Sequence, residues 1–286
     1  MIILRTIREL RDAVRTARAP DKRIGLVPTM GAFHEGHLSL IRRARERCGF
    51  VIVTLFVNPS QFNDAADLAR YPRDESGDAA LASSAGADVL FAPSVEEIYP
   101  SGFMTTVEAT ELAEPLEGVV RGTRHFEGVA TVVTKLLNMA QPDEAFFGQK
   151  DAQQALIIRR LVRDLDFPVR IQVCPTVREG DGLAMSSRNM LLDPDARRRA
   201  PALSRALFAV ADAVARGETN TDAAMETGRS MLAQQGIVPE YFAAVSSETL
   251  APVRTFDGET LVAIAARFGS IRLIDNVIVG TGSAAS

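Results

Sequence analysis

The 286-residue chain has no tryptophan, two cysteines and three histidines. Cys48 and Cys174 lie far apart, and no Cys/His spacing resembles a zinc site or a disulfide framework. Isolated thiols are typical of a reducing compartment, so we expect a cytoplasmic location. The apolar run 51–57 is much shorter than the roughly 20 residues of a membrane span, and residues 1–9 turn polar too early for a signal peptide. We therefore expect no membrane association.

Clustered positive charge is also scarce. The chain carries 32 Lys and Arg against 36 Asp and Glu, with a net charge of −4. Binding to a nucleic-acid backbone needs clustered basic residues, so the composition argues against a nucleic-acid partner. The longest basic run, 197–199, follows Asp193-Pro194, a helix-capping pattern. We predict that this run is a solvated helix face.

Several common active-site motifs are missing. The sequence has no G-x-x-x-x-G-K-[ST], which argues against a P-loop. No G-x-G-x-x-G follows the first strand-like segment, which argues against a dinucleotide-dependent dehydrogenase. No G-x-S-x-G is present, which argues against a serine hydrolase of the α/β class.

What is present is an alternation of short β-branched runs and helical patterns. Strands are predicted near 24–28, 51–57, 88–91, 144–147 and 169–173, and helices near 37–48, 74–85, 128–140 and 151–164. Strands separated by helices predict an α/β fold with a doubly wound parallel sheet. Ligands of such sheets bind outside the carboxyl ends of the strands.

The pattern changes after about residue 176. Helices are predicted near 194–216 and 221–235, followed by strands near 240–246, 260–266 and 271–279. Helices followed by a run of strands predict a smaller C-terminal α+β domain. We therefore expect a first domain over 1–176 and a second over 177–286.

Residues 24–37, IGLVPTMGAFHEGH, contain two of the three histidines after an apolar run. A strand, a glycine-containing loop and a helix start favour phosphate binding, because backbone N–H groups and the helix dipole meet there. Two ordinary loop or helix-cap histidines are the alternative. Metal binding by His34 and His37 is least favoured, since the spacing is not that of H-E-x-x-H.

Three further segments combine chemistry-bearing residues. Residues 147–154, FGQKDAQQ, follow a strand, and Lys150 there could neutralise phosphate charge. Residues 185–189, MSSRN, place hydroxyls beside Arg188, which suits phosphate recognition. The amides of Asn58 and Gln61 could orient a small substrate. A capped surface helix and ordinary polar loops are the alternative interpretations.

Together, segments 28–37, 57–62, 148–154 and 185–189 resemble, in order and separation, the signature stretches of the pantothenate synthetase family. The resemblance extends over about residues 1–280. It implies a Rossmann-like fold of the nucleotidyltransferase superfamily, a smaller C-terminal lid domain and a homodimer. It also implies ATP-dependent joining of pantoate and β-alanine through a pantoyl adenylate, with Mg²⁺, releasing AMP and pyrophosphate.

The resemblance carries roles onto matching positions. It implies catalytic roles for His34, His37, Lys150 and Arg188, with His37 as proton donor. Residues implied in pantoate and β-alanine binding are Asn58, Gln61 and Gln154. Metal ligands are unknown, with Mg²⁺ expected mainly on the ATP phosphates. Residues implied in ATP binding are Met30, Gly31, Ala32, Phe33, His34, Glu35, Gly36, His37, Gly148, Gln149, Lys150, Asp151, Val177, Met185, Ser186, Ser187 and Arg188.

The chain departs from the family pattern in places. Residues 121–126 read RGTRHF where the family usually has R-P-G-H-F, so either Arg121 or Arg124 could be the family arginine. Gln149 replaces a common glutamate, and Gly180 a common proline. Two other functions remain: a nucleotidyltransferase that leaves the nucleotide on its product, and a non-catalytic nucleotide-binding protein.

Overall fold

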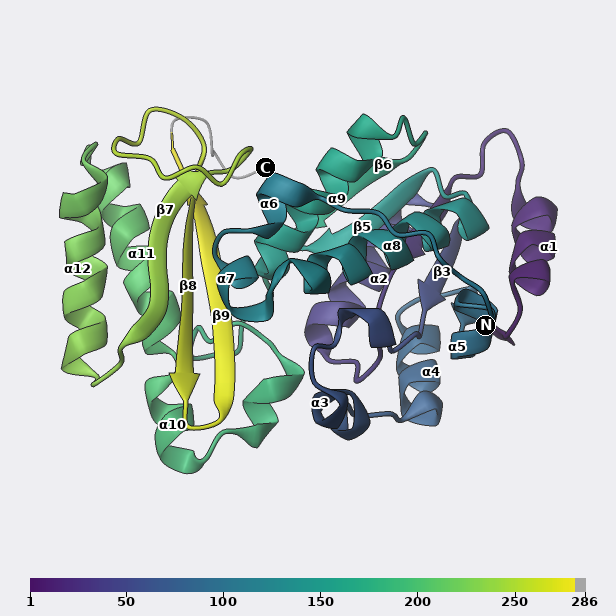
Figure 1. Cartoon of the computed structure of the whole chain (residues 1–286), viewed down its shortest axis with the longest axis horizontal. Helices are drawn as coiled ribbons and strands as arrows, with labels where there is room; N and C mark the ends of the chain where they lie inside the picture. The colour runs from purple at the N-terminus through teal and green to yellow at the C-terminus, as the bar shows by residue number, and fades with distance from the viewer. Residues whose placement is uncertain (281–286) are drawn as a thin grey trace. The chain divides into compact units, whose positions relative to one another are not determined.

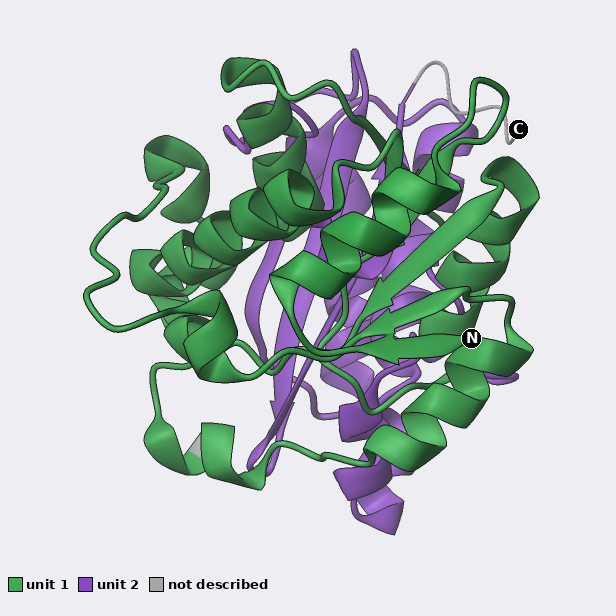
Figure 2. Cartoon of the chain, turned by 90° about the vertical axis from the view of Figure 1, so that its right-hand side faces the viewer, with its two compact units in different colours: residues 1–148, 153–175 green, residues 149–152, 176–286 purple. Residues whose placement is uncertain are grey.

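The computed structural model describes residues 1–280, with only the backbone of Asp67. Residues 281–286, the end of the predicted second domain, lie outside this range. The chain divides into two compact units (Figure 2). Unit 1 comprises Met1–Gly148 and Gln153–Pro175, and unit 2 comprises Gln149–Ala152 and the described residues from Thr176 onward.

Unit 1 contains a six-stranded parallel sheet in the order β1-β4-β3-β2-β5-β6. Its strands are β1 (Ile2–Leu4), β2 (Ile24–Val27), β3 (Phe50–Thr54), β4 (Val89–Phe91), β5 (Glu144–Gly148) and β6 (Arg170–Cys174). The side chains alternate between two buried clusters: Ile24 and Leu26 belong to one, and Val27 to the other. The sheet is therefore covered on both faces, as expected for strands rich in β-branched residues without polar alternation.

Helices cover these two faces. One cluster includes α1 (Ile7–Ala17), α8 (Thr123–Ala140) and α9 (Ala152–Asp164), and the other includes α2 (Glu35–Arg47) and α4 (Glu75–Ser84). Figure 2 shows helices on both sides of the strands of unit 1. Shorter segments are η1 (Pro59–Gln61), α3 (Ala65–Arg70), α5 (Val95–Ile98), α6 (Thr110–Ala113) and α7 (Glu117–Arg121).

Side-chain caps determine where several helices begin. Thr6 forms a capping box with Glu9 at α1, and Asp74 accepts from the backbone N–H of Gly77 at α4. In unit 2, Asp193 caps α10 (Pro194–Arg199) with Pro194 at the first helical position, as the sequence predicts. Each cap satisfies N–H groups that lack partners inside the helix.

Unit 2 contains an antiparallel sheet of β7 (Pro239–Ser246), β8 (Thr260–Phe268) and β9 (Ile271–Val279). The helices α11 (Ala202–Ala215) and α12 (Thr221–Gln234) pack on one face of this sheet (Figure 1). Leu203, Leu207 and Ile264 lie in the shared core. The other segments are η2 (Gln149–Asp151) and η3 (Ser187–Leu191).

The predicted fold class is confirmed, and three predicted element boundaries are wrong. The strand predicted over 51–57 ends at Thr54. Beyond it, the N–H of Leu55 bonds the carbonyl of Phe91 and the N–H of Phe56 bonds that of Thr29, but regular pairing with a neighbouring strand stops. The helix predicted over 194–216 is two helices that separate at residues 200–201, where proline cannot continue the backbone ladder. The helix predicted from 128 begins at Thr123, after Gly122 with a φ of 74°.

Two further observations concern the basic run 197–199 and the apolarity of the helices. Arg197 of the predicted solvated run pairs with Glu179 and Asp181 at 2.6 and 2.5 Å, so this face is not wholly solvated. Among residues 1–280, no helix combines the length and apolarity that a membrane crossing needs.

Candidate functional site

The sheet of unit 1 has a topological switch point between β2 and β5. The chain proceeds from β2 to β3 and β4 on one side, whereas β5 and β6 lie on the other side of β2. In an open α/β sheet, the loops that leave the carboxyl ends at such a point diverge and form a ligand crevice. The predicted histidine loop follows β2, and Gly148 ends β5.

Both histidines of this loop cap helix α2. His34 Nδ1 accepts from the backbone N–H of Gly36 at 3.1 Å, and His37 Nδ1 accepts from the N–H of His34 at 3.4 Å. The ring centroids lie 4.2 Å apart. A neutral imidazole that accepts at Nδ1 carries its proton on Nε2, so each ring becomes a donor at Nε2. The capping and phosphate-binding interpretations are therefore compatible.

Asp78 is a buried carboxylate that the sequence analysis missed. It accepts from the backbone N–H groups of Ala32 at 2.9 Å and Phe33 at 2.7 Å, and is 4% exposed. Gly31 beside it has a φ of +93°, and a Cβ there would lie 2.8 Å from Asp78 Oδ2. The sequence carried no clear signal for this role, because α4 has no pronounced apolar stripe and the partners of Asp78 are backbone N–H groups of a distant loop.

Asn58 and Gln61 belong to one buried hydrogen-bond network at η1. Asn58 Nδ2 donates to Gln61 Oε1 at 3.0 Å and to the carbonyl of Gly128 at 3.1 Å, and Asn58 is 1% exposed. Tyr99 donates its hydroxyl proton to Asn58 Oδ1 at 2.9 Å. His125 Nδ1 donates to the Gln61 carbonyl at 2.7 Å. Because Gln61 Oε1 accepts a hydrogen bond from Asn58, the orientation of the Gln61 amide is fixed and its Nε2 protons can be donated to another group.

The neighbouring glutamines of α9 differ in their surroundings. Gln153 is 5% exposed, and its amide bonds the carbonyls of Leu112 and Pro115 and the N–H of Glu117. Gln154 is half-buried. Gln153 therefore has a structural role, whereas the substrate-binding role implied for Gln154 stays a prediction.

The two candidate arginines of 121–126 also differ. Arg121 Nε donates to Glu117 Oε2 at 2.8 Å, and Glu117 is 7% exposed. Arg124 lies at the exposed start of α8. Arg121 is the arginine held in place by a buried carboxylate.

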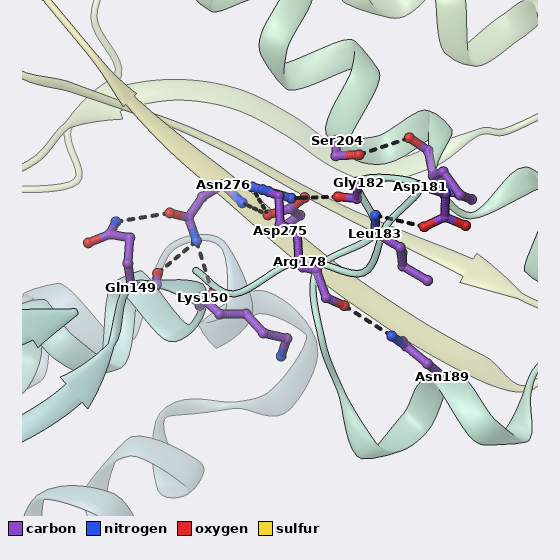
Figure 3. Close-up of polar contacts among 12 residues, drawn as sticks. Gln149, Lys150, Arg178, Asp181, Gly182, Leu183, Asn189, Ser204, Asp275 and Asn276 are labelled. Carbon is purple, nitrogen blue, oxygen red and sulfur yellow. Dashed lines mark hydrogen bonds and ion pairs between the residues drawn. The ribbon is translucent and has the colours of Figure 1, made fainter. Parts of the chain in front are cut away.

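In unit 2, the predicted Lys150 lies in the short turn η2. Its Nζ is 3.9 Å from Asp151 Oδ1, and its side chain is 20% exposed. The side chain of Asn276 in β9 binds the backbone of this turn (Figure 3). Asp275, next to it, accepts from both Arg178 terminal nitrogens, at 2.6 and 3.0 Å.

Residues 177 and 185–188, which the sequence predicts to bind ATP, belong to one hydrogen-bonded loop of unit 2. The N–H of Met185 donates to the carbonyl of Val177 at 2.9 Å, which closes a hairpin. Ser186 caps η3 by accepting from the N–H of Arg188 at 3.3 Å. The buried Asn189, labelled in Figure 3, donates from Nδ2 to Glu179 Oε1 at 2.6 Å. Within the described residues, the half-buried Arg188 side chain makes no ion pair.

Metal ligands are not evident. Over residues 1–280, no group of three or more His, Cys, Asp or Glu side chains is arranged to hold a metal ion. The described residues therefore offer no protein cage for Mg²⁺, and none of them is assigned as a ligand.

Sequence comparison places the chain among known proteins. A family model described as "Pantoate-beta-alanine ligase" matches residues 2–278. A pantothenate synthetase from Cereibacter sphaeroides is 50% identical over 277 residues, which is 97% of this chain and 99% of that protein. One from Pelotomaculum thermopropionicum is 48% identical over 281 residues, covering 98% of this chain and 99% of that protein.

Solved structures agree with these relatives. A pantothenate synthetase from Thermus thermophilus has a TM-score of 0.90 and 46% identity, covering 97% of this chain and 99% of that one. A pantoate-beta-alanine ligase from Francisella tularensis, complexed with beta-gamma ATP and beta-alanine, has a TM-score of 0.76 and 34% identity, covering 97% of each chain. The chain described here therefore belongs to the pantoate-beta-alanine ligase family of enzymes.

Proposed function

We propose that this chain joins (R)-pantoate to β-alanine at the expense of ATP, through a pantoyl adenylate, and releases AMP and pyrophosphate. The observation that supports this most strongly is the family match over residues 2–278, together with a relative 50% identical over nearly the whole chain. The 34%-identical Francisella tularensis ligase was solved with an ATP ligand and β-alanine. ATP and β-alanine are therefore the first ligands to test.

In the first step, a pantoate carboxylate oxygen attacks the α-phosphorus of ATP. A P–O bond forms to pantoate, the α–β bridging P–O bond breaks, and pyrophosphate leaves with the electron pair. Negative charge grows on the phosphoryl oxygens. Lys150 and Arg188 stabilise this charge as cations, and His34 and His37 donate from Nε2. Donation from Nε2 follows from the Nδ1 atoms accepting backbone N–H groups.

Gln61 and Gln154 hold the pantoate. Asn58 donates to Gln61 Oε1, so the remaining Gln61 Nε2 protons suit acceptor oxygens such as a carboxylate or hydroxyl. A substrate held this way loses rotational freedom before the chemical step, which is the main contribution of a positioning group.

In the second step, the β-alanine amine attacks the activated carbonyl. The C–N bond forms, the carbonyl–phosphate C–O bond breaks, AMP leaves, and the amine loses its proton. A mixed anhydride is sensitive to water, so the loop that carries Ser186 and Arg188 serves as a lid that excludes water. Val177 contributes its backbone to adenine binding, and Gly148 and Asp151 contribute to ATP binding.

Three further properties are proposed from the family alone: a homodimer, a cytoplasmic location and a requirement for Mg²⁺. Mg²⁺ supplies charge neutralisation on ATP when bound. Among the described residues, no group of three or more His, Cys, Asp or Glu side chains could hold it, so we expect the phosphates to be its main ligands.

The test is pyrophosphate exchange into ATP, measured with and without pantoate. We expect exchange only with pantoate, because adenylate formation is reversible without β-alanine. Pantoate labelled with ¹⁸O in its carboxylate should transfer one label to AMP once β-alanine is added. Absence of this transfer, or a product that retains the nucleotide, would contradict the proposal and favour a nucleotidyltransferase.

A further inference from the structure

Asn276 is a buried polar residue in β9, a strand whose residues Leu273 and Val279 belong to the core of unit 2. It is 4% exposed, and it follows Asp275 in β9. Consecutive strand residues point to opposite faces of a sheet. Asp275 shares the face of Leu273, which packs in the core with α11 and α12, so Asn276 points away from that core.

The side chain of Asn276 binds the turn η2 through three hydrogen bonds (Figure 3). Its Nδ2 donates to the carbonyl of Gln149 at 3.0 Å and to the carbonyl of Lys150 at 2.9 Å. Its Oδ1 accepts from Gln149 Nε2 at 2.9 Å. Both Nδ2 protons and the Oδ1 atom of Asn276 therefore form hydrogen bonds with the same turn.

This arrangement requires an amide. An aspartate at the same place would bring one carboxylate oxygen to about 3 Å from two carbonyl oxygens, with no proton to share. An alanine would leave the two carbonyls and the Gln149 amide without these partners, and buried polar groups without partners are costly.

The turn in question carries Lys150. Among the described residues, its ammonium group pairs with Asp151 at 3.9 Å, and the Asp151 side chain is 51% exposed. An exposed pair at that distance holds a side chain weakly. The position of the ammonium group therefore depends mainly on the backbone from which the side chain leaves.

The strand that carries Asn276 is itself anchored. Asp275 is 3% exposed, receives two hydrogen bonds from Arg178, and accepts from the N–H of Asn276 at 2.8 Å. Arg178 also donates to the carbonyl of Gly182 at 3.1 Å. The turn is therefore bound by Asn276, and the adjacent residue Asp275 is held by a buried ion pair with Arg178.

We propose that Asn276 is a positioning residue for Lys150: it fixes the η2 backbone so that the lysine ammonium meets the charge that develops on the transferred phosphoryl group. The proposal rests on the phosphate role proposed above for Lys150. Nothing in the sequence pattern indicates it, because β9 and the turn are more than a hundred residues apart.

The first experiment compares pantoate-dependent pyrophosphate exchange in full-length Asn276→Ala, Asn276→Asp and Gln149→Glu variants. We expect kcat to fall by about 10- to 100-fold in Asn276→Ala, since small misplacements of a catalytic group have effects of this size. Asn276→Asp should reduce kcat further. Gln149→Glu should reduce it less, because it opposes one carboxylate oxygen to Asn276 Oδ1 but leaves both bonds to the turn carbonyls in place. The KM for pantoate should change little in all three.

A matched control is Thr260→Val, which removes the polar group of another buried residue in the same sheet. Thr260 is 2% exposed, and its hydroxyl donates to the carbonyl of Gly258 rather than to the turn. We expect unchanged kcat in this variant even if Tm falls. A kcat loss equal to that of Asn276→Ala would mean general destabilisation and would overturn the proposal.

A second experiment tests whether Asn276 acts through Lys150. In a Lys150→Ala background, Asn276→Ala should add less than about a twofold loss, because the group that it positions is gone. Fully multiplicative losses, or wild-type kcat in Asn276→Ala, would overturn the inference. Gln149→Glu in the same background provides this test if Asn276→Ala does not fold.

Hydrogen–deuterium exchange separates this inference from the proposed reaction. A peptide covering residues 149–152 should exchange faster in Asn276→Ala than in the native protein and in Thr260→Val, whatever the enzyme catalyses. Unchanged exchange there overturns the inference alone. Absent pyrophosphate exchange in the native protein overturns the reaction, and the deuterium result still decides whether Asn276 holds the turn.

Discussion

At the scale of single residues, the histidines of segment 28–37 have an observed capping role in addition to the phosphate-binding role that we propose. His34 ends the loop, caps α2 through Nδ1 and contacts the ring of His37. The histidine pair could be selected from sequence because two of three histidines fall beside glycines after a strand. Asp78 could not be selected, since its partners are backbone N–H groups more than forty residues away.

Asp78→Asn should loosen the Gly31–Phe33 backbone. An asparagine keeps one acceptor oxygen but presents an NH₂ group to the second N–H, so one charge-assisted bond is lost. We expect a loss of about 1.5–3 kcal/mol, shared between folding stability and kcat/KM for ATP. Steady-state exchange and thermal unfolding measure the two parts.

The control for this variant is Asp74→Asn on the same helix. Asp74 caps α4 and contacts Gly77 and Ser76, not the loop, and asparagine is an equally good cap. Its activity should equal that of the native protein. Equal effects of the two substitutions would contradict a specific role for Asp78.

Lys150→Ala should remove the ammonium that we propose to stabilise developing phosphoryl charge. We expect adenylate formation to slow by about 2–4 kcal/mol of transition-state stabilisation, with little change in Tm. The half-buried side chain makes a distant contact with Asp151, so its loss costs the fold little. Near-normal pantoate-dependent exchange in this variant would show that the assignment of Lys150 is wrong.

At the scale of elements, β5 has a proposed catalytic segment at one end and a buried ion-pair cluster at the other. Its last residue, Gly148, precedes the turn of Lys150, whereas its first residue, Glu144, lies at the amino edge of the sheet. Glu144 is 2% exposed and accepts from Arg47 at 2.7 Å, Gln172 at 2.9 Å and Arg23 at 3.1 Å. We therefore expect substitutions at Glu144 to affect stability separately from the reaction proposed at the other end of the strand.

Glu144→Gln should lower stability without lowering activity. Burial alone would raise the pKa of the Glu144 carboxyl, but hydrogen bonds and charge from Arg47, with Gln172 and Arg23, lower it overall. A lowered folded pKa stabilises the protein above the unfolded pKa of about 4.3, and this contribution disappears as pH falls through the folded value. At pH 7 we expect a loss of about 1.5–3 kcal/mol.

Urea unfolding at a series of pH values checks this prediction. The difference between native and Glu144→Gln protein should be largest near pH 7 and should shrink in acid, below the unfolded pKa. A difference that stays constant down to pH 3, or a fall in kcat, would contradict it.

Elements were predictable where the pattern was long and periodic. The five strands predicted for the first domain and the three predicted for the second are all present. The 11-residue helix α1 was missed although it is long enough to show a period, and so were the helical segments α3, α5, α6, α7, η2 and η3. The three-residue elements η1 and β1 were also missed. Three-residue segments carry too few positions for a period to show. The division of the helix at 200–201 shows a local breaker overriding a continuous apolar pattern, since Ala200 and Ala202 are both buried.

At the scale of the whole molecule, both cysteines report on folding. Cys48 and Cys174 are free and buried, at 4% and 8% exposure. Burial raises the pKa of Cys48 to about 11 and also raises that of Cys174. Only the thiolate is nucleophilic, so neither group should react while the unit is folded.

A disulfide reagent at pH 8 should therefore label no thiol in the native protein and both thiols in denaturant. The labelling rate at intermediate urea should follow the unfolding of unit 1, which contains both residues. Rapid labelling of either thiol under native conditions would contradict their burial.

The amino-acid sequence by itself determined the fold class and the family: buried parallel strands read as continuous apolar runs, and four signature segments keep their order. It also marked the residues whose chemistry is unusual locally, such as His34, His37 and Lys150. Only the tertiary structure decided which groups hold them, because Asp78 and Asn276 act on backbone atoms of distant segments. Backbone donors and acceptors are the same at every residue, so no local pattern reveals which side chain will bind them.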